Sequence, residues 1–113
     1  MIQVYGIKNC DSVKKAIKFF KDNDLEYTLH DFKTQELDCS KLTSWLLHVD
    51  MKKLFNSRST TYKNLNLKEL NPNDDEKKEW LCKENLLIKR PVIEYNDKVI
   101  VGYNEDEYKK ELI

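Results

Sequence analysis

Arginine is scarce in this chain of 113 residues: of its 20 basic residues only Arg58 and Arg90 are arginine, and the other 18 are lysine. Glycine and proline each occur only twice. The 20 basic residues are matched by 20 acidic ones, so no surplus of positive charge indicates a nucleic-acid-binding face. No apolar run approaches the roughly 20 residues of a membrane-spanning helix.

The sequence also lacks the marks of export. It does not open with a basic segment, an apolar stretch and a small-residue cleavage site, so we expect no secretory signal. Cys10, Cys39 and Cys82 are an odd number of cysteines at long intervals, which is neither a disulfide framework nor the spacing of a zinc site. His30 and His48 fall in unrelated segments and suggest no metal cluster. We therefore expect a cytoplasmic protein without membrane or nucleic-acid partners.

The first third of the chain follows a strand–helix–strand pattern. Ile2 and Val4 alternate with a polar residue, as in a short strand. Apolar residues then recur at helical spacing, namely Val13, Ala16, Ile17 and Phe20. Tyr27 and Leu29 indicate a second strand, and two short strands joined by one helix favour parallel pairing.

The rest of the chain has a helical middle and then returns to strands. Residues 42–49 and 76–85 predict helices, with Asp38 and Ser40 as candidate caps of the first. Residues 91–101 predict a tight hairpin, and Asn104 with Glu107 resembles a capping box of a last helix. We expect one α/β domain over residues 1–113, with a sheet core from about 1–33 and 89–113 and a helical insertion at about 34–88.

Cys10 is the first candidate for chemistry, because it stands between the first strand and the following helix. Unpaired backbone N–H groups and the positive end of the helix dipole favour a thiolate there. Lys8, Lys14 and Lys15 add positive charge nearby, and Asp11 opposes them. The alternative is a small side chain that only fills the strand–helix junction.

For the other two cysteines we expect a role in packing. Cys39 lies three residues before Leu42, in line with the apolar face of that helix, and Cys82 lies among apolar residues. Val13 stands three positions after Cys10, so the chain has no Cys-x-x-Cys redox pair. A redox partner for Cys10 must come from elsewhere in the fold or from another molecule.

Arg58 and Arg90 are candidates for an anion site, because ordinary basic positions in this chain are lysine. Arginine supplies a planar fork that binds carboxylate, phosphate and related oxyanions through two bonds. Arg58 also lies among the hydroxyl groups of residues 57–61. The alternative is that both are solvent-exposed charges. Pro91, which follows Arg90, begins an apolar strand, and base rates alone would leave its peptide bond trans.

Four segments together resemble a known family: residues 6–16 (Gly-Ile-Lys-Asn-Cys-Asp-Ser-Val-Lys-Lys-Ala), 56–58 (Asn-Ser-Arg), 89–91 (Lys-Arg-Pro) and 101–103 (Val-Gly-Tyr). In this order and at this spacing they resemble the ArsC/Spx family of glutaredoxin-dependent arsenate reductases, Spx-type transcription regulators and YffB-like proteins. The first segment looks closest to the YffB-like branch. The resemblance covers essentially the whole chain and implies a thioredoxin-like fold in which Pro91 is a cis-proline facing the Cys10 loop.

The resemblance also implies a mechanism. Cys10 would be the nucleophile, and an external thiol from glutathione or glutaredoxin would resolve its adduct. Arg58 and Arg90 match two of the three arginines that hold the anion in the reductases. The weaker loop candidates are Lys8, Asn9 and Ser12. No bound cofactor or metal is expected; glutathione would be a co-substrate, and the substrate would be a small oxyanion or a thiol compound.

One departure from the reductases concerns Tyr103, which stands where they carry the third arginine. A charge-assisted hydrogen bond contributes about 1.5–3 kcal/mol, so we expect weak arsenate reduction or none. The role suggested for YffB-like proteins, glutathione-dependent thiol reduction, fits better.

The alternative is a redox-responsive regulator that binds the RNA polymerase α subunit, as Spx-type proteins do. Residues 101–107 look very like the corresponding segment of those regulators. However, Val13 replaces the second cysteine of their Cys-x-x-Cys, and Asp50 replaces a contact glycine. Both departures count against polymerase binding. A site that no longer supports catalysis is the third possibility.

Overall fold

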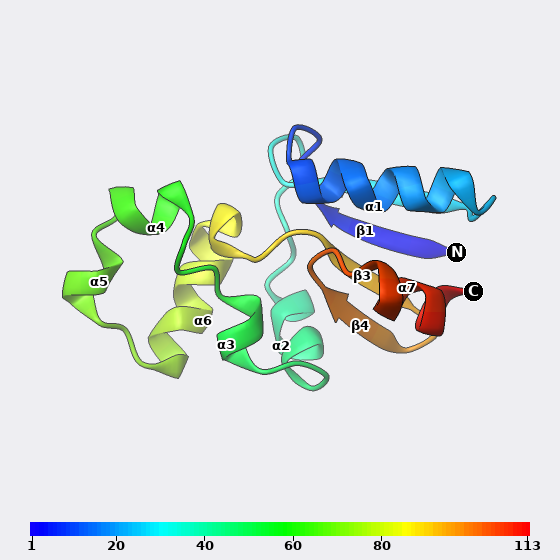
Figure 1. The fold of residues 1–113 in the computed structure, drawn as a ribbon. Helices are drawn as coiled ribbons and strands as arrows, with labels where there is room; N and C mark the ends of the chain where they lie inside the picture. Colours follow the sequence, from blue (N-terminus) through cyan, green and yellow to red (C-terminus); the bar gives the residue numbers. More distant parts are fainter. The chain divides into compact units, whose positions relative to one another are not determined.

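The computed structural model describes residues 1–113, which form two compact units (Figure 1). The sheet unit comprises Met1–Gln35 and Arg90–Ile113, and the helical unit comprises Glu36–Lys89. The insertion expected at about residues 34–88 corresponds in position to the helical unit. No helix in either unit has both the length and the apolar character needed to cross a membrane.

The sheet unit is built on four strands in the order β2-β1-β3-β4. The strands are β1 (Ile2–Gly6), β2 (Tyr27–Asp31), β3 (Val92–Tyr95) and β4 (Lys98–Val101). β1 pairs with β2 in parallel, with Gly6 opposite Asp31, and pairs with β3 antiparallel. β3 and β4 form an antiparallel hairpin. The predicted parallel pair, hairpin and mixed α/β sheet are confirmed.

Helices α1 (Asp11–Asp22) and α7 (Glu105–Leu112) pack with the sheet around one apolar core (Figure 1). The buried residues of this core are Ile2, Val4, Ala16, Phe19, Phe20, Ile93, Ile100, Tyr108 and Leu112. They alternate along the strands and recur at helical spacing in α1, which is why this stretch folds as it does. Phe19 and Tyr108 meet edge to face, with ring centroids 5.5 Å apart, and so join the two helices.

Turn and cap chemistry fixes the end of the sheet unit. Asn96 and Asp97 connect β3 to β4, and both have positive φ, as a two-residue hairpin turn requires. Asn104 is the N-cap of α7, and its side chain accepts the N–H of Glu107 at 3.0 Å. The Tyr108 hydroxyl then donates a 2.7 Å hydrogen bond to the Gly102 carbonyl oxygen.

The helical unit consists of short helices. They are α2 (Ser40–Leu46), α3 (Met51–Leu54), α4 (Thr60–Asn64), α5 (Leu67–Leu70), α6 (Asp74–Lys83) and the 3₁₀ helix η1 (Asn85–Leu87). α6 packs against α2, α3 and η1. A capping box between Asn73 and Glu76 begins α6, with acidic residues through its first turn.

Of the two caps predicted for α2, only Asp38 binds the start of the helix. Cys39 directly precedes the first helical residue, Ser40, but its side chain makes no capping hydrogen bond. The Asp38 carboxylate accepts the backbone N–H of Ser40 at 3.0 Å, and the Asp38 backbone carbonyl oxygen accepts that of Lys41 at 3.0 Å. The hydrogen bond from Ser40 lowers the pKa of the Asp38 carboxyl below its usual value.

The packing roles predicted for Cys39 and Cys82 were wrong, because the two residues form a disulfide. Their Cα atoms are 5.3 Å apart although 43 positions separate them in the sequence. Cys39 is exposed at the start of α2 rather than lying on its buried face, and Cys82 is half-buried in the last turn of α6. The packing of α2 on α6 brings the two residues together.

Candidate thiol site

Cys10 is the N-cap residue of α1 and carries a free, half-buried thiol. Its backbone is extended, and its carbonyl oxygen accepts the N–H of Lys14 at 2.9 Å, which begins the helix. Its side chain makes no capping hydrogen bond. The sulfur is therefore at the end of a 12-residue helix where first-turn amides lack helical partners and the dipole is positive.

The loop between β1 and Cys10 is held by Asp31, a residue that sequence reasoning missed. The Asp31 carboxylate accepts the backbone N–H of Lys8 at 3.3 Å and that of Lys33 at 2.8 Å. Cys10 donates its own N–H to the carbonyl oxygen of Ile7 at 3.2 Å. Parallel pairing of Gly6 with Asp31 places this carboxylate beside the loop, so the predicted pairing of the two strands was the signal that could have found it.

Gly6 brings three parts of the sheet unit together. A β-carbon built on Gly6 would lie 2.7 Å from the Cγ2 atom of Val13, which is fully buried in the first turn of α1. The same β-carbon would lie 3.7 Å from Cβ and 3.8 Å from Cγ of Arg90. The stem of Arg90 therefore runs beside the strand end from which the Cys10 loop begins.

Arg90 and Pro91 lead into β3 next to this loop. The peptide bond between them is cis. The family resemblance implied this, whereas the low frequency of cis bonds before proline favoured trans. The Pro91 carbonyl oxygen accepts the N–H of Gly102 at 2.8 Å. Gly102 has a φ of 85°, a left-handed conformation that favours glycine. This second glycine thus fixes the turn from β4 towards α7 beside Pro91.

The sheet unit contains all the predicted site residues except Arg58. Among the weaker candidates, Lys8 and Asn9 are exposed in the loop, and Ser12 is half-buried in the first turn of α1. Arg58 belongs to the helical unit, where it is exposed. Its backbone N–H donates to Oδ1 of Asn56 at 3.1 Å, and α4 begins just after it.

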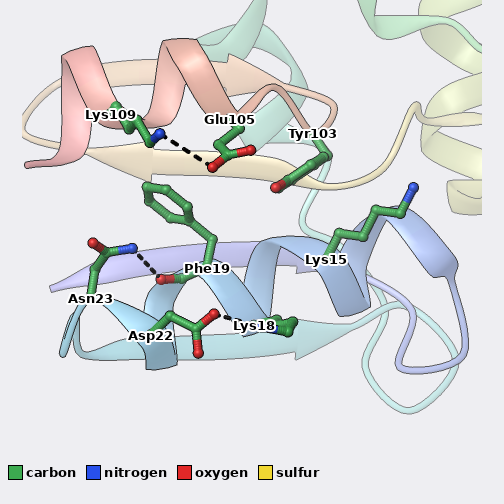
Figure 2. A pocket seen from close by; sticks show the side chains of 8 residues that line it. All are labelled: Lys15, Lys18, Phe19, Asp22, Asn23, Tyr103, Glu105 and Lys109. Carbon is green, nitrogen blue, oxygen red and sulfur yellow. Dashed lines mark hydrogen bonds and ion pairs between the residues drawn. The ribbon is translucent and has the colours of Figure 1, made fainter.

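Tyr103 lines a cavity of about 420 Å³ between α1 and α7 in the sheet unit (Figure 2). Its ring meets that of Tyr108 edge to face, with centroids 5.4 Å apart. In Figure 2, Tyr103 and Lys15 lie at the end of the cavity nearer the start of α1. Two ion pairs also line the cavity, Lys18–Asp22 at 2.7 Å and Lys109–Glu105 at 3.3 Å. Because carboxylates accompany the lysines, these walls do not form a concentrated anion site.

The order of strands and helices in the sheet unit, with one free cysteine at the start of its first helix, defines a thioredoxin-like protein that has a single cysteine at its site. The family model described as ArsC family matches residues 5–111. The chain therefore belongs to the ArsC family, in agreement with the resemblance in its sequence.

Similar proteins support this assignment. An uncharacterized protein of Haemophilus influenzae is 44% identical over 109 residues, which covers 96% of each chain. The solved structure of a YFFB protein matches with a TM-score of 0.92 and 28% identity over 100% of both chains. An arsenate reductase-related protein from Brucella melitensis has a TM-score of 0.75 and 33% identity, covering 98% of this chain and 93% of the other.

The regulators of the family are more distant relatives. The global transcriptional regulator Spx 2 of Bacillus anthracis is 25% identical over 114 residues, covering 97% of this chain and 86% of the regulator. At Val13, where those regulators were expected to carry a second cysteine, this chain has a fully buried side chain packed close to Gly6.

Proposed function

We propose that this chain is a thiol oxidoreductase that uses Cys10 as its one nucleophile and an external thiol of the glutathione or glutaredoxin class as reductant. The observation that carries the proposal is the position of Cys10, a free thiol at the start of α1 in a chain of the ArsC family. A thiolate held at the N-terminus of a helix is well suited to attack sulfur.

The proposed reaction has two exchange steps. In the first, the Cys10 thiolate attacks the glutathione sulfur of a mixed disulfide; a new sulfur–sulfur bond forms, the old one breaks, and the substrate leaves as a thiolate that takes a proton from water. In the second, a glutathione thiolate attacks the Cys10–glutathione bond, which releases glutathione disulfide and restores the Cys10 thiolate. In the sum of the two steps one free glutathione is consumed: the substrate sulfur is reduced to a thiol, and the sulfur of the free glutathione takes its place in glutathione disulfide.

Arg58 and Arg90 are proposed to hold the carboxylates of glutathione or a small oxyanion. Each guanidinium can make two parallel hydrogen bonds to such a group, which a lysine cannot do. The proposed role of Arg90 is supported by the position of its stem beside Gly6, the strand end from which the Cys10 loop begins. With Tyr103 in place of a third arginine, we propose weak arsenate reduction or none.

A comparison of two variants tests this function. The wild type and Cys10→Ser are assayed for reduction of arsenate and of a glutathione mixed disulfide, with glutathione and glutaredoxin supplied. We expect turnover of the mixed disulfide by the wild type and its loss in Cys10→Ser. The double variant Cys39→Ser/Cys82→Ser is the matched control and should keep turnover, because it removes two sulfur atoms and leaves Cys10, Arg58 and Arg90 unchanged.

The second candidate is an Spx-type regulator, favoured by the similarity of residues 101–107 and by the distant Spx relatives. Its expected partner is the RNA polymerase α subunit. No turnover with either substrate, together with co-purification of the α subunit, would support the regulator and overturn the enzyme.

A further inference from the structure

The helical unit contains a second pair of sulfur atoms that the proposed reaction does not use. Cys39 and Cys82 are disulfide-bonded, and their Cα separation of 5.3 Å lies within the range that a disulfide spans. Cys39 is close to the first residue of the unit, Glu36, and Cys82 is close to the last, Lys89. The bond therefore joins the two segments at which the chain enters and leaves this unit, which form its base, and it closes almost the whole unit into one covalent loop.

The two sulfurs differ in how easily a thiol reaches them. Cys39 is exposed, whereas Cys82 is half-buried in the last turn of α6. An attacking thiolate must approach one sulfur along the line of the bond, so access selects the sulfur that is attacked. Disulfides that solvent and small thiols reach are the labile ones. The geometry therefore favours attack at Cys39 with Cys82 as the leaving thiolate.

A polar clamp would keep the two cysteines together after the bond opens. The Asn85 side chain accepts the backbone N–H of Leu37 at 3.0 Å and donates to the carbonyl oxygens of Leu81 at 2.9 Å and Cys82 at 3.4 Å. Leu37 is itself buried. Because this clamp joins the segment before Cys39 to the end of α6 without the disulfide, the reduced thiols would stay near each other and could close again.

We propose that Cys39 and Cys82 are a reversible dithiol–disulfide couple, opened by small thiols of the glutathione class, that fastens the base of the helical unit according to the redox state of its surroundings. A glutathione thiolate attacks Sγ of Cys39, which forms a mixed disulfide and releases the Cys82 thiolate. A second glutathione thiolate attacks the glutathione sulfur of that mixed disulfide, and the Cys39 thiolate leaves as glutathione disulfide forms. Both cysteine thiolates take protons from water, and the two electrons come from glutathione.

The couple is tested in full-length Cys10→Ser protein, so that no other thiol takes part. The protein is equilibrated in buffers of varied ratio of reduced to oxidised glutathione and quenched with acid. Its free thiols are then alkylated and located by peptide mass. We expect one two-electron transition from a Cys39–Cys82 disulfide to two alkylated cysteines, with glutathione trapped on Cys39 and not on Cys82. Amide hydrogen exchange should be faster at the end of α6 in the reduced form.

The variant Asn85→Ala distinguishes a reversible redox couple from a disulfide that only stabilises the fold. Loss of the clamp should shift the transition so that at least several-fold less reduced glutathione opens the bond, while Lys68→Gln, an exposed residue on α5, should leave it unchanged. Two results would overturn the proposal: no Cys39–Cys82 disulfide at any ratio, or a disulfide that excess reduced glutathione does not open. Because Cys10 is absent from this experiment, its outcome is independent of the proposed enzyme activity.

Discussion

Gly6 and Val13 approach each other so closely that a β-carbon on Gly6 would lie 2.7 Å from Val13 Cγ2, nearer than real side-chain contacts come. Val13 is fully buried and β-branched, so it cannot rotate away at low cost. We predict that Gly6→Ala lowers the free energy of unfolding by about 1–3 kcal/mol, a typical cost of overpacking. Denaturant titration measures this change.

Relief of the same clash provides the control for Gly6. In Gly6→Ala/Val13→Ala the smaller residue in α1 makes room for the new methyl group, so the loss of stability should be smaller than the sum of the two single losses. The stretch from Gly6 to Val13 contains Cys10, so Gly6→Ala should also slow alkylation of that thiol. Additive losses would show that the close approach does not constrain the loop.

Replacing either of the proposed anion-holding arginines by lysine should lower activity, although the positive charge is kept. Arg58→Lys and Arg90→Lys each remove a two-bond contact and retain the positive charge. Under the proposed function, each should lower kcat/KM for the glutathione mixed disulfide by about 10- to 100-fold, equivalent to about 1.5–3 kcal/mol. Steady-state kinetics at several glutathione concentrations would measure the loss.

Matched lysine positions provide the controls for these arginines. Lys89→Gln, beside Arg90, and Lys63→Gln, on α4 near Arg58, are exposed and remove a charge without touching the guanidinium groups. Both should leave kcat/KM within about twofold of the wild type, in keeping with the small effects of most surface substitutions. An equal loss in the controls and the arginine variants would argue for a general charge effect.

Tyr108 ties α7 to Gly102 through its hydroxyl, which donates at 2.7 Å to the buried Gly102 carbonyl oxygen. Tyr108→Phe should lower the free energy of unfolding by about 1–3 kcal/mol, because a buried acceptor loses its donor. Thermal denaturation at neutral pH would measure this change. No loss of stability would mean that the hydroxyl does not hold α7.

Alkaline pH supplies a separate test of the same phenol. Burial raises the pKa of Tyr108 above its ordinary value of 10.0. Above pH 10 the unfolded chain releases this proton while the folded chain keeps it, so stability present at lower pH falls by up to about 1.4 kcal/mol per pH unit. The unfolding free energy of Tyr108→Phe should therefore fall less steeply above pH 10 than that of the wild type. Equal slopes would contradict this.

The sheet unit was largely predictable because its signals are local. Alternation at Ile2 and Val4 and helical spacing from Val13 to Phe20 reflect a single apolar core, and one connecting helix favours parallel strands. The place of Cys10 at the start of α1 followed from the same reading. The cis bond before Pro91 did not, since base rates alone favour trans and only the family resemblance implied it.

The structural features that could not be predicted from the sequence depend on contacts between distant segments. Cys39 and Cys82 are 43 positions apart, and only the packing of α2 on α6 shows that they pair. The hold of Asp31 on the Lys8 amide depends likewise on β1 and β2 being in register. The close approach of Gly6 to Val13 depends on where α1 lies over the end of β1. Periodicity carries none of this information.

The most direct measurement of the proposed chemistry is the mass of the covalent intermediate. Cys39→Ser/Cys82→Ser protein, whose only thiol is Cys10, is mixed with one equivalent of a glutathione mixed disulfide, quenched with acid and mapped by peptide mass. We predict that glutathione becomes attached to Cys10 faster than to a free cysteine peptide at pH 7, and that added glutathione removes it. Attachment at the rate of the free peptide, or an adduct that glutathione leaves in place, would contradict Cys10 as the catalytic nucleophile.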